Sequence, residues 1–401
     1  MFRVLFCVTL MVFSIVSQAA LLSPRTYNKL NDIQLSINEQ PSIEARVEIN
    51  EQLIELAEDL QGNPLGLALT WQTHAQLMLL DENYSKANGY LSKAIVLEGL
   101  DGATVFQLRS FYAQTLFIEE RYVKVIEVLK QIMSATDFKE SAAIYSLTAA
   151  AFYSLNDFNE GLPFIVKAIK LSNKPKEAWL QMAFSGFYQQ KNLEKALFYI
   201  NKLVLNFPDK KDYWQQKTGM HQLIEEFPDA ASTKELSFKK GFIVKESDYI
   251  NLGQLLASQG NAYKVAQALQ EAFDEDGLEQ TEKSLRLMQQ AWTQAKEMDK
   301  AVASLKVLFE RFNEAIDGVR LMKFLVDDEQ WQPAIDVSEQ LLTLKLKEKQ
   351  MGEVLLLSGI CHYRTGQTRH AFKALSKAMA IDSSSSQAKG WISYIKQLQE
   401  S

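Results

Sequence analysis

The sequence predicts an all-α solenoid of about nine to ten helix pairs with a C-terminal capping helix. A small residue recurs about every 35 positions, and a fixed period of this size is typical of stacked helical repeats. The recurring positions are Ala87, Val125, Gly161, Ala196, Ala231, Val265, Ala301, Ala334 and Ala371. Only 17 glycines and 8 prolines occur in 401 residues, which is too few turn residues for a sheet protein.

Apolar residues around each small residue predict a helix, a short turn and a second helix. Between Trp71 and Gly99, apolar residues follow helical spacing on both sides of the turn Asp81-Glu82-Asn83. We place the small residue where the two helices cross, because a larger side chain would hold the backbones apart.

The N-terminus, residues 1–19, is typical of a secretory signal peptide. Arg3 precedes an apolar run from Val4 to Val16, and small residues follow up to Ala19. We therefore expect cleavage after Ala19 and export of the remaining chain. The alternative is an uncleaved inner-membrane anchor over residues 4–22, a segment nearly long enough to cross a bilayer.

The export signal is followed by three predicted regions. Residues 20–62 are expected to form a degenerate helix pair and residues 63–383 the tandem repeats. Residues 212–245 are the weakest repeat, because Pro228 and Gly241 disturb the predicted second helix, and we expect an irregularity of the solenoid there.

Residues 384–401 are expected to form the capping helix. The serines from Ser383 to Ser386 are interpreted as a turn and N-cap, and the helix is predicted from Gln387 to Glu400. One side of this helix is apolar and carries Trp391, Tyr394, Ile395 and Leu398. Such a helix would cover the open end of a linear array.

Composition excludes several classes of partner and reaction. The net charge is −6, and loss of Arg3 with the signal makes it about −7, so nucleic acid and anionic membranes are not expected partners. Cys361 is the one cysteine after the signal, so the mature chain has no intramolecular disulfide, and we interpret Cys361 as a buried apolar residue.

No pattern indicates catalysis, a cofactor or a metal. The four histidines, His74, His221, His362 and His370, are scattered without the spacing of a zinc site, and we interpret them as structural or surface residues. The sequence contains no phosphate-binding loop or nucleophile elbow. We therefore expect the protein not to be an enzyme.

The repeat resembles the tetratricopeptide repeat, whose unit is a pair of antiparallel helices. The resemblance implies that first helices line a concave groove, where amides and phenols suit an extended peptide. The groove positions are Gln76, Gln114, Tyr153, Gln181, Tyr188, Gln189, Gln254, Arg286, Gln290, Gln294, Tyr363 and Arg364. Gln76, Gln114, Gln254 and Gln290 occupy the same repeat position.

The chain after the signal is also similar to an exported tetratricopeptide family found with bacterial TonB systems. The motifs that carry the similarity are Leu22-Ser23-Pro24, Gly62-Asn63-Pro64, Phe207-Pro208, Leu252-Gly253-Gln254, Gln290-Ala291-Trp292, Asp328-Glu329-Gln330-Trp331 and Leu355-Leu356-Leu357-Ser358-Gly359-Ile360. This family works in the periplasm beside TonB, ExbB and ExbD, which drive uptake of iron complexes.

The similarity implies a periplasmic scaffold that binds TonB, ExbB or ExbD and touches the membrane only through these partners or an uncleaved anchor. The alternative is a periplasmic assembly factor or chaperone-like adaptor for envelope proteins or peptidoglycan enzymes. Each repeat of a long solenoid adds contact area without a deep pocket, which suits both functions.

Overall fold

The computed structural model describes residues 22–400, which form 21 α-helices and contain no strand. The predicted signal peptide lies outside this range. Among the described residues, no helix combines the length and apolar character that a bilayer crossing requires.

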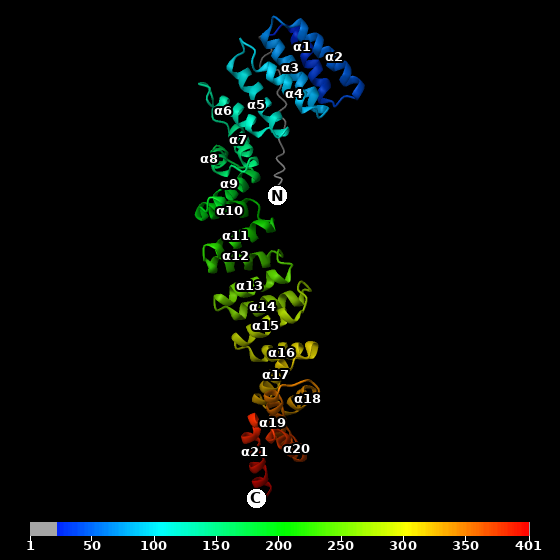
Figure 1. Cartoon of the computed structure of the whole chain (residues 1–401), viewed down its shortest axis with the longest axis vertical. Helices are drawn as coiled ribbons and strands as arrows, with labels where there is room; N and C mark the ends of the chain where they lie inside the picture. Colours follow the sequence, from blue (N-terminus) through cyan, green and yellow to red (C-terminus); the bar gives the residue numbers. More distant parts are fainter. Residues whose placement is uncertain (1–21, 401) are drawn as a thin grey trace. The chain divides into compact units, whose positions relative to one another are not determined.

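The chain divides into two compact units, Met1–Tyr213 and Trp214–Ser401. Helices pair in chain order within each unit, and each pair packs on its neighbours (Figure 1). The first unit contains α1 (Pro24–Asn38), α2 (Ile43–Asp59), α3 (Pro64–Leu80), α4 (Tyr84–Ala94), α5 (Gly102–Ile118), α6 (Tyr122–Met133), α7 (Ala142–Ser154), α8 (Phe158–Lys170), α9 (Glu177–Gln189) and α10 (Leu193–Asn206).

The boundary between the units falls within α11 (Lys211–Leu223). The second unit continues with α12 (Phe227–Lys239), α13 (Glu246–Ser258), α14 (Ala262–Asp274), α15 (Glu282–Gln294), α16 (Met298–Phe312), α17 (Ala315–Asp327), α18 (Trp331–Leu341), α19 (Glu348–Arg364), α20 (Thr368–Met379) and α21 (Asp382–Glu400). Ten helix pairs and a final single helix confirm the predicted α-solenoid.

The recurring small residues lie at the closest approach of the two helices in a pair. Ala87, Ala196, Ala301 and Ala371 are all fully buried. In the fourth pair, a Cβ added to the recurring residue Gly161 of α8 would lie 2.7 Å from Cδ2 of Tyr153 on α7. The small side chains are therefore required by the helix crossing, as the period predicts.

Each pair closes through a turn with one residue in the left-handed region. After α3, Glu82 has φ 53°, and the N–H of Asn83 donates to the carbonyl of Met78 at 2.8 Å. This is the hydrogen bond of a Schellman motif. The left-handed residues of the ten turns are Gln40, Glu82, Glu120, Asn156, Lys191, Glu225, Gly260, Lys296, Glu329 and Gly366.

Most of these turns place a side chain in a conformation that costs about 1–2 kcal/mol for residues other than glycine. Lys296, with φ 61°, is exposed, so Lys296→Gly is expected to stabilise the second unit by about 0.5–1 kcal/mol. The neighbouring Ala295 has an ordinary φ of −73°, so Ala295→Gly should destabilise it instead. Urea titrations of both variants measure the difference, and equal effects would contradict the explanation.

The structure corrects the predicted register of the sixth pair. The recurring position is Ala230 and not Ala231, because the N–H of Ala230 donates to the carbonyl of Glu226 at 3.0 Å, as Ala196 does to Asn192. Pro228 does not disturb α12. It lies in the first turn of this helix, where a backbone N–H has no acceptor within the helix, so proline costs no hydrogen bond.

The final helix caps the last pair, as predicted, but it begins earlier. Ala388 and Ile395 of α21 are buried against apolar residues of α19 and α20. The serines interpreted as a turn belong to the first turns of α21, and the hydroxyl of Ser384 donates to the carbonyl of Ala378 at 2.7 Å. Tyr394 and Leu398, expected on the packed side, are about half exposed.

Candidate functional site

The predicted groove residues all lie on the first helices of their pairs, and we call this surface the first-helix face. The structure separates them into residues that bond adjacent pairs together and residues that remain open to solvent.

Gln76 and Gln114 are half-buried in the first unit. The side-chain oxygen of Gln76 accepts a hydrogen bond from Nε2 of Gln34 at 3.4 Å, which joins α3 to α1. Oε1 of Gln114 is buried and, among the described atoms, has no hydrogen-bond partner. Both amides are therefore only partly accessible to solvent.

Tyr153 joins two consecutive first helices. Its hydroxyl donates to the carbonyl of Met182 at 2.7 Å, which links α7 to α9, and burial raises the pKa of this phenol. A Cβ added to Gly186 would lie 2.1 Å from the Tyr153 hydroxyl oxygen, so Gly186 provides the space for this contact. Tyr153 therefore acts as a brace between repeats.

Gln181 belongs to a polar cluster between α9 and the start of α11. Its amide donates to the hydroxyl of Tyr213, and that hydroxyl donates to the carboxylate of Glu177. Lys210 pairs with the same carboxylate at 2.6 Å. Burial and the bond to Glu177 raise the pKa of Tyr213. At the end of α9, Tyr188 and Gln189 remain exposed.

Arg286 is the strongest inter-repeat contact of the second unit. Its guanidinium forms two hydrogen bonds of 2.8 Å with the carboxylate of Asp317, which joins α15 to α17. Asp317 is fully buried, whereas Arg286 keeps partial exposure and also contacts Glu282 at 2.8 Å. These bonds, the one to Asp317 first, raise the pKa of Arg286.

Tyr363 and Arg364 lie at the end of α19. The Tyr363 ring packs against Trp391 and Tyr394 of the capping helix, with ring centroids 6.3 and 6.2 Å apart. The guanidinium of Arg364 lies 5.5 Å from the centroid of Trp331. Tyr363 is therefore half covered by the cap, while Arg364 remains exposed.

Gln254, Gln290 and Gln294 are exposed amides of the second unit, and we call them the amide row. Gln254 on α13 and Gln290 on α15 occupy the same position of successive repeats. Each primary amide offers two donors and one acceptor, which matches the alternating groups of an extended backbone.

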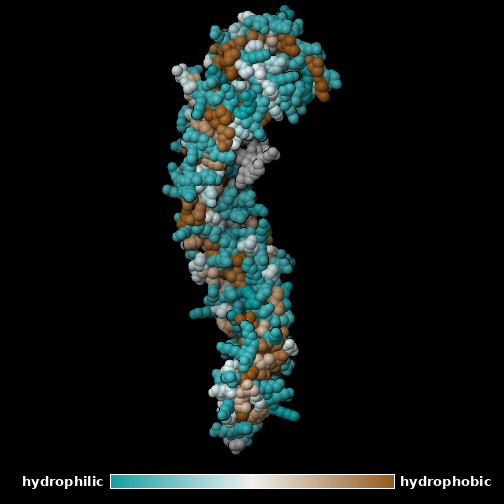
Figure 2. All heavy atoms as spheres, in the orientation of Figure 1, coloured by the Kyte–Doolittle hydropathy of each residue, from teal (hydrophilic) through white to brown (hydrophobic). Residues whose placement is uncertain are grey.

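A second exposed surface lies on α2, where an apolar stripe is bordered by glutamates. Ile43, Val47 and Ile54 are 73, 56 and 45% exposed and lie on one side of this helix. Figure 2 shows hydrophobic patches within a mostly hydrophilic surface, including the part that α2 forms. Exposed apolar stripes with polar borders are typical of protein contact surfaces.

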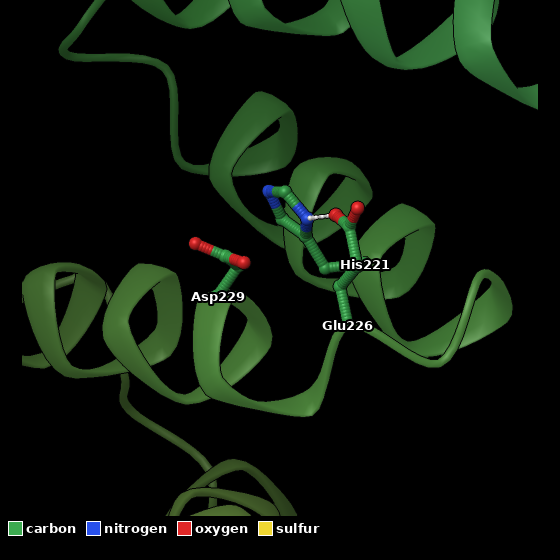
Figure 3. A group of neighbouring side chains, drawn as sticks. All are labelled: His221, Glu226 and Asp229. Atoms are coloured by element: carbon green, nitrogen blue, oxygen red, sulfur yellow. Dashed lines mark hydrogen bonds and ion pairs between the residues drawn. The ribbon is translucent and has the colours of Figure 1, made fainter.

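The structure also brings together three side chains that the sequence analysis did not connect. Nδ1 of His221, near the end of α11, lies 2.8 Å from the carboxylate of Glu226, the N-cap residue of α12. One ligand atom of each of His221, Glu226 and Asp229 lies within 4.8 Å of the others, and in the view of Figure 3 the two carboxylates lie on either side of the imidazole. The signal in the sequence is His-x4-Glu-x2-Asp across a turn.

The last pair contains the same arrangement with different chemistry. His362 occupies the position of His221, and its Nδ1 lies 3.0 Å from the amide oxygen of Gln367, the N-cap residue of α20. His370 replaces Asp229, and its ring centroid is 5.4 Å from that of His362. A bond from this histidine position to the N-cap side chain therefore recurs in two repeats.

His74 is buried in the first unit, where its ring stacks on Tyr90 and Nε2 lies 2.6 Å from Oδ1 of Asn50. Burial, assisted by the charge of Lys93, lowers the pKa of His74 from 6.5 to about 4. Cys361 is buried as predicted, and burial raises the pKa of its thiol to about 11, so the thiol stays protonated at neutral pH.

The lowered pKa of His74 makes the stability of the first unit depend on pH. In the unfolded chain this histidine binds a proton below about pH 6.5. In the folded chain it stays neutral down to about pH 4. We expect a loss of about 1–2 kcal/mol between pH 7 and pH 5 from this group. Hydrogen exchange of α3 at both pH values measures this loss of stability. The same loss between pH 7 and pH 5 in His74→Gln would contradict the assignment to His74.

Comparisons with known proteins do not identify a family for this chain. No profile of a known protein family matches the chain. No curated protein matches it either. The chain has a tetratricopeptide-like fold. This conclusion rests on the ten helix pairs, their period and their buried small residues.

One similar structure is a tetratricopeptide repeat protein from Parabacteroides merdae, with 11% identity and a TM-score of 0.37 over 65% of this chain and 98% of that one. Another is YrrB, described as having an unusual peptide-binding site, with 14% identity and a TM-score of 0.38 over 46% of this chain and 91% of that one. A third is the TPR2AB domain of yeast Sti1 in complex with pHSP90, with 11% identity and a TM-score of 0.34 over 68% of this chain and 99% of that one. All three TM-scores are below 0.5, so these likenesses add nothing to the argument from helix pairing.

Proposed function

We propose that the protein is a periplasmic scaffold without enzymatic activity that binds TonB, ExbB or ExbD components and supports TonB-dependent uptake of iron complexes. The observation that carries the binding role is the amide row on α13 and α15. Gln254 and Gln290 repeat at one position, face solvent and make no hydrogen bond within the described chain that would occupy them.

The rest of the first-helix face supports the same role by holding the repeats rigid. Tyr153, the Glu177 cluster and the Arg286–Asp317 pair fix neighbouring first helices to one another. A preordered surface loses less conformational freedom when a partner binds, so a long, shallow contact gains affinity. The TonB partner itself rests on the sequence resemblance.

The test is growth and siderophore uptake of a deletion strain under iron limitation, complemented with wild-type or variant protein. We expect the wild type to restore uptake and Gln254→Ala/Gln290→Ala to restore less. Gln267→Ala, which removes an exposed amide from the second helix α14 and not from the first-helix face, is the matched control. Normal uptake in the deletion strain would contradict the TonB role, and defective outer-membrane protein assembly in iron-replete cells would favour an assembly factor.

A further inference from the structure

We propose that His221, Glu226 and Asp229 form a binding site for a divalent cation of the zinc type. The three side chains come from the end of α11, the N-cap of α12 and the first turn of α12, and one ligand atom of each lies within 4.8 Å of the other two. Imidazole nitrogen and carboxylate oxygen are both common ligands of Zn²⁺. In the view of Figure 3 the two carboxylates lie on either side of the ring, and that of Glu226 is joined to it.

Charge supports a cation at this place. Glu226 and Asp229 bring two carboxylates to one imidazole, and the only ion-pair contact of either among the described residues is that of Glu226 with His221. The carboxylate of Glu226 makes no N-cap hydrogen bond to its own helix, although it occupies the N-cap position. Its contact is therefore with His221 and not with the backbone of α12, which suits a role as a ligand beside this imidazole. A divalent cation would balance both carboxylates.

The two carboxylates also have the freedom to move that metal binding requires. The imidazole of His221 is 7% exposed and fixed, whereas Glu226 and Asp229 are exposed. Ligand atoms of a tetrahedral zinc ion lie about 3.3–3.5 Å apart, given metal–ligand distances of about 2.0–2.2 Å. Rotation of the two exposed carboxylates brings the ligand atoms from their present separations of up to 4.8 Å to this spacing. Water completes the coordination shell of the metal.

The equivalent turn of the last pair gives a contrast within the same chain. There the N-cap side chain is the amide of Gln367, and His370 stands in place of Asp229. The histidine keeps its bond to the N-cap residue without any carboxylate, so the bond alone explains the structural role of this histidine position. The carboxylates at 226 and 229 are what distinguishes the proposed site.

The test is a calorimetric titration of the tag-free, EDTA-treated full chain with ZnCl₂. We expect wild type to bind one Zn²⁺ at this site and Glu226→Gln/Asp229→Asn to bind it more than about tenfold more weakly, since even supporting partners of metal ligands contribute about 10–100-fold. Glu226→Gln reproduces the histidine–amide bond of the last pair, so the fold is retained, which thermal melting verifies.

Two control variants locate the site. Glu225→Gln removes an exposed carboxylate next to the cluster, and His370→Gln removes the second histidine of the other turn. Both are expected to bind Zn²⁺ as the wild type does. Absence of binding by the wild type, unchanged affinity in Glu226→Gln/Asp229→Asn, or loss of the site in Glu225→Gln or His370→Gln would each overturn the proposal.

Discussion

Replacement of Arg286 with alanine is expected to lower the stability of the second unit by about 3–5 kcal/mol. The carboxylate of Asp317 is fully buried and receives two hydrogen bonds of 2.8 Å from the guanidinium. Without Arg286 this carboxylate remains buried and uncompensated, or it must bind a proton. Either result lowers the stability far more than the loss of an exposed ion pair does.

Hydrogen exchange of the amides in α15 and α17 measures this effect in the full chain, because repeat arrays open locally. Glu282→Gln is the matched control, since it removes only the exposed partner of Arg286 and should cost less than about 1 kcal/mol. The double variant Arg286→Met/Asp317→Leu should cost less than Arg286→Ala, because no charge is left unpaired. A loss below about 1 kcal/mol in Arg286→Ala would contradict the role of this pair.

Enlarging the recurring small residue is expected to have the second largest effect. Ala301 of α16 is fully buried within the core of the second unit. Ala301→Leu places a large side chain at the crossing of α15 and α16 and should cost about 1–3 kcal/mol. Ala196→Leu should have a similar effect in the first unit, because Ala196 occupies the same repeat position.

Ala303 provides the control for overpacking, because it lies on the same helix and is exposed. Ala303→Leu should change stability by no more than about 0.5 kcal/mol. Urea unfolding of the three variants distinguishes the two buried crossing positions from the exposed position 303. An unchanged midpoint in Ala301→Leu or Ala196→Leu would mean that the small residues do not mark the helix crossings.

The fold could be predicted from the sequence because its main determinant is local and periodic. The small residue and its apolar neighbours recur within each pair, so spacing alone identified the pairs and the crossings. The register failed at Ala230 because two adjacent alanines, both buried, satisfy the same pattern. The start of α21 was missed because serine suits both an N-cap and a first helical turn.

The functional surface was less predictable, because the sequence shows which residues share a face and not which of them bond across repeats. Arg286 and Asp317, or Tyr153 and Met182, are about 30 residues apart, and their contact depends on how one pair lies on the next. Spacing therefore could not separate braces such as Tyr153 from open residues such as Gln254. The cluster at His221 joins residues across a turn, and helical spacing does not describe that geometry.

The most direct test of the scaffold function is quantitative affinity purification of the tagged protein from crosslinked membranes of iron-limited cells. We predict recovery of TonB, ExbB or ExbD with the wild type, and reduced recovery with Gln254→Ala/Gln290→Ala but not with Gln267→Ala. Recovery of none of the three proteins above the level of an untagged strain would contradict the proposed function.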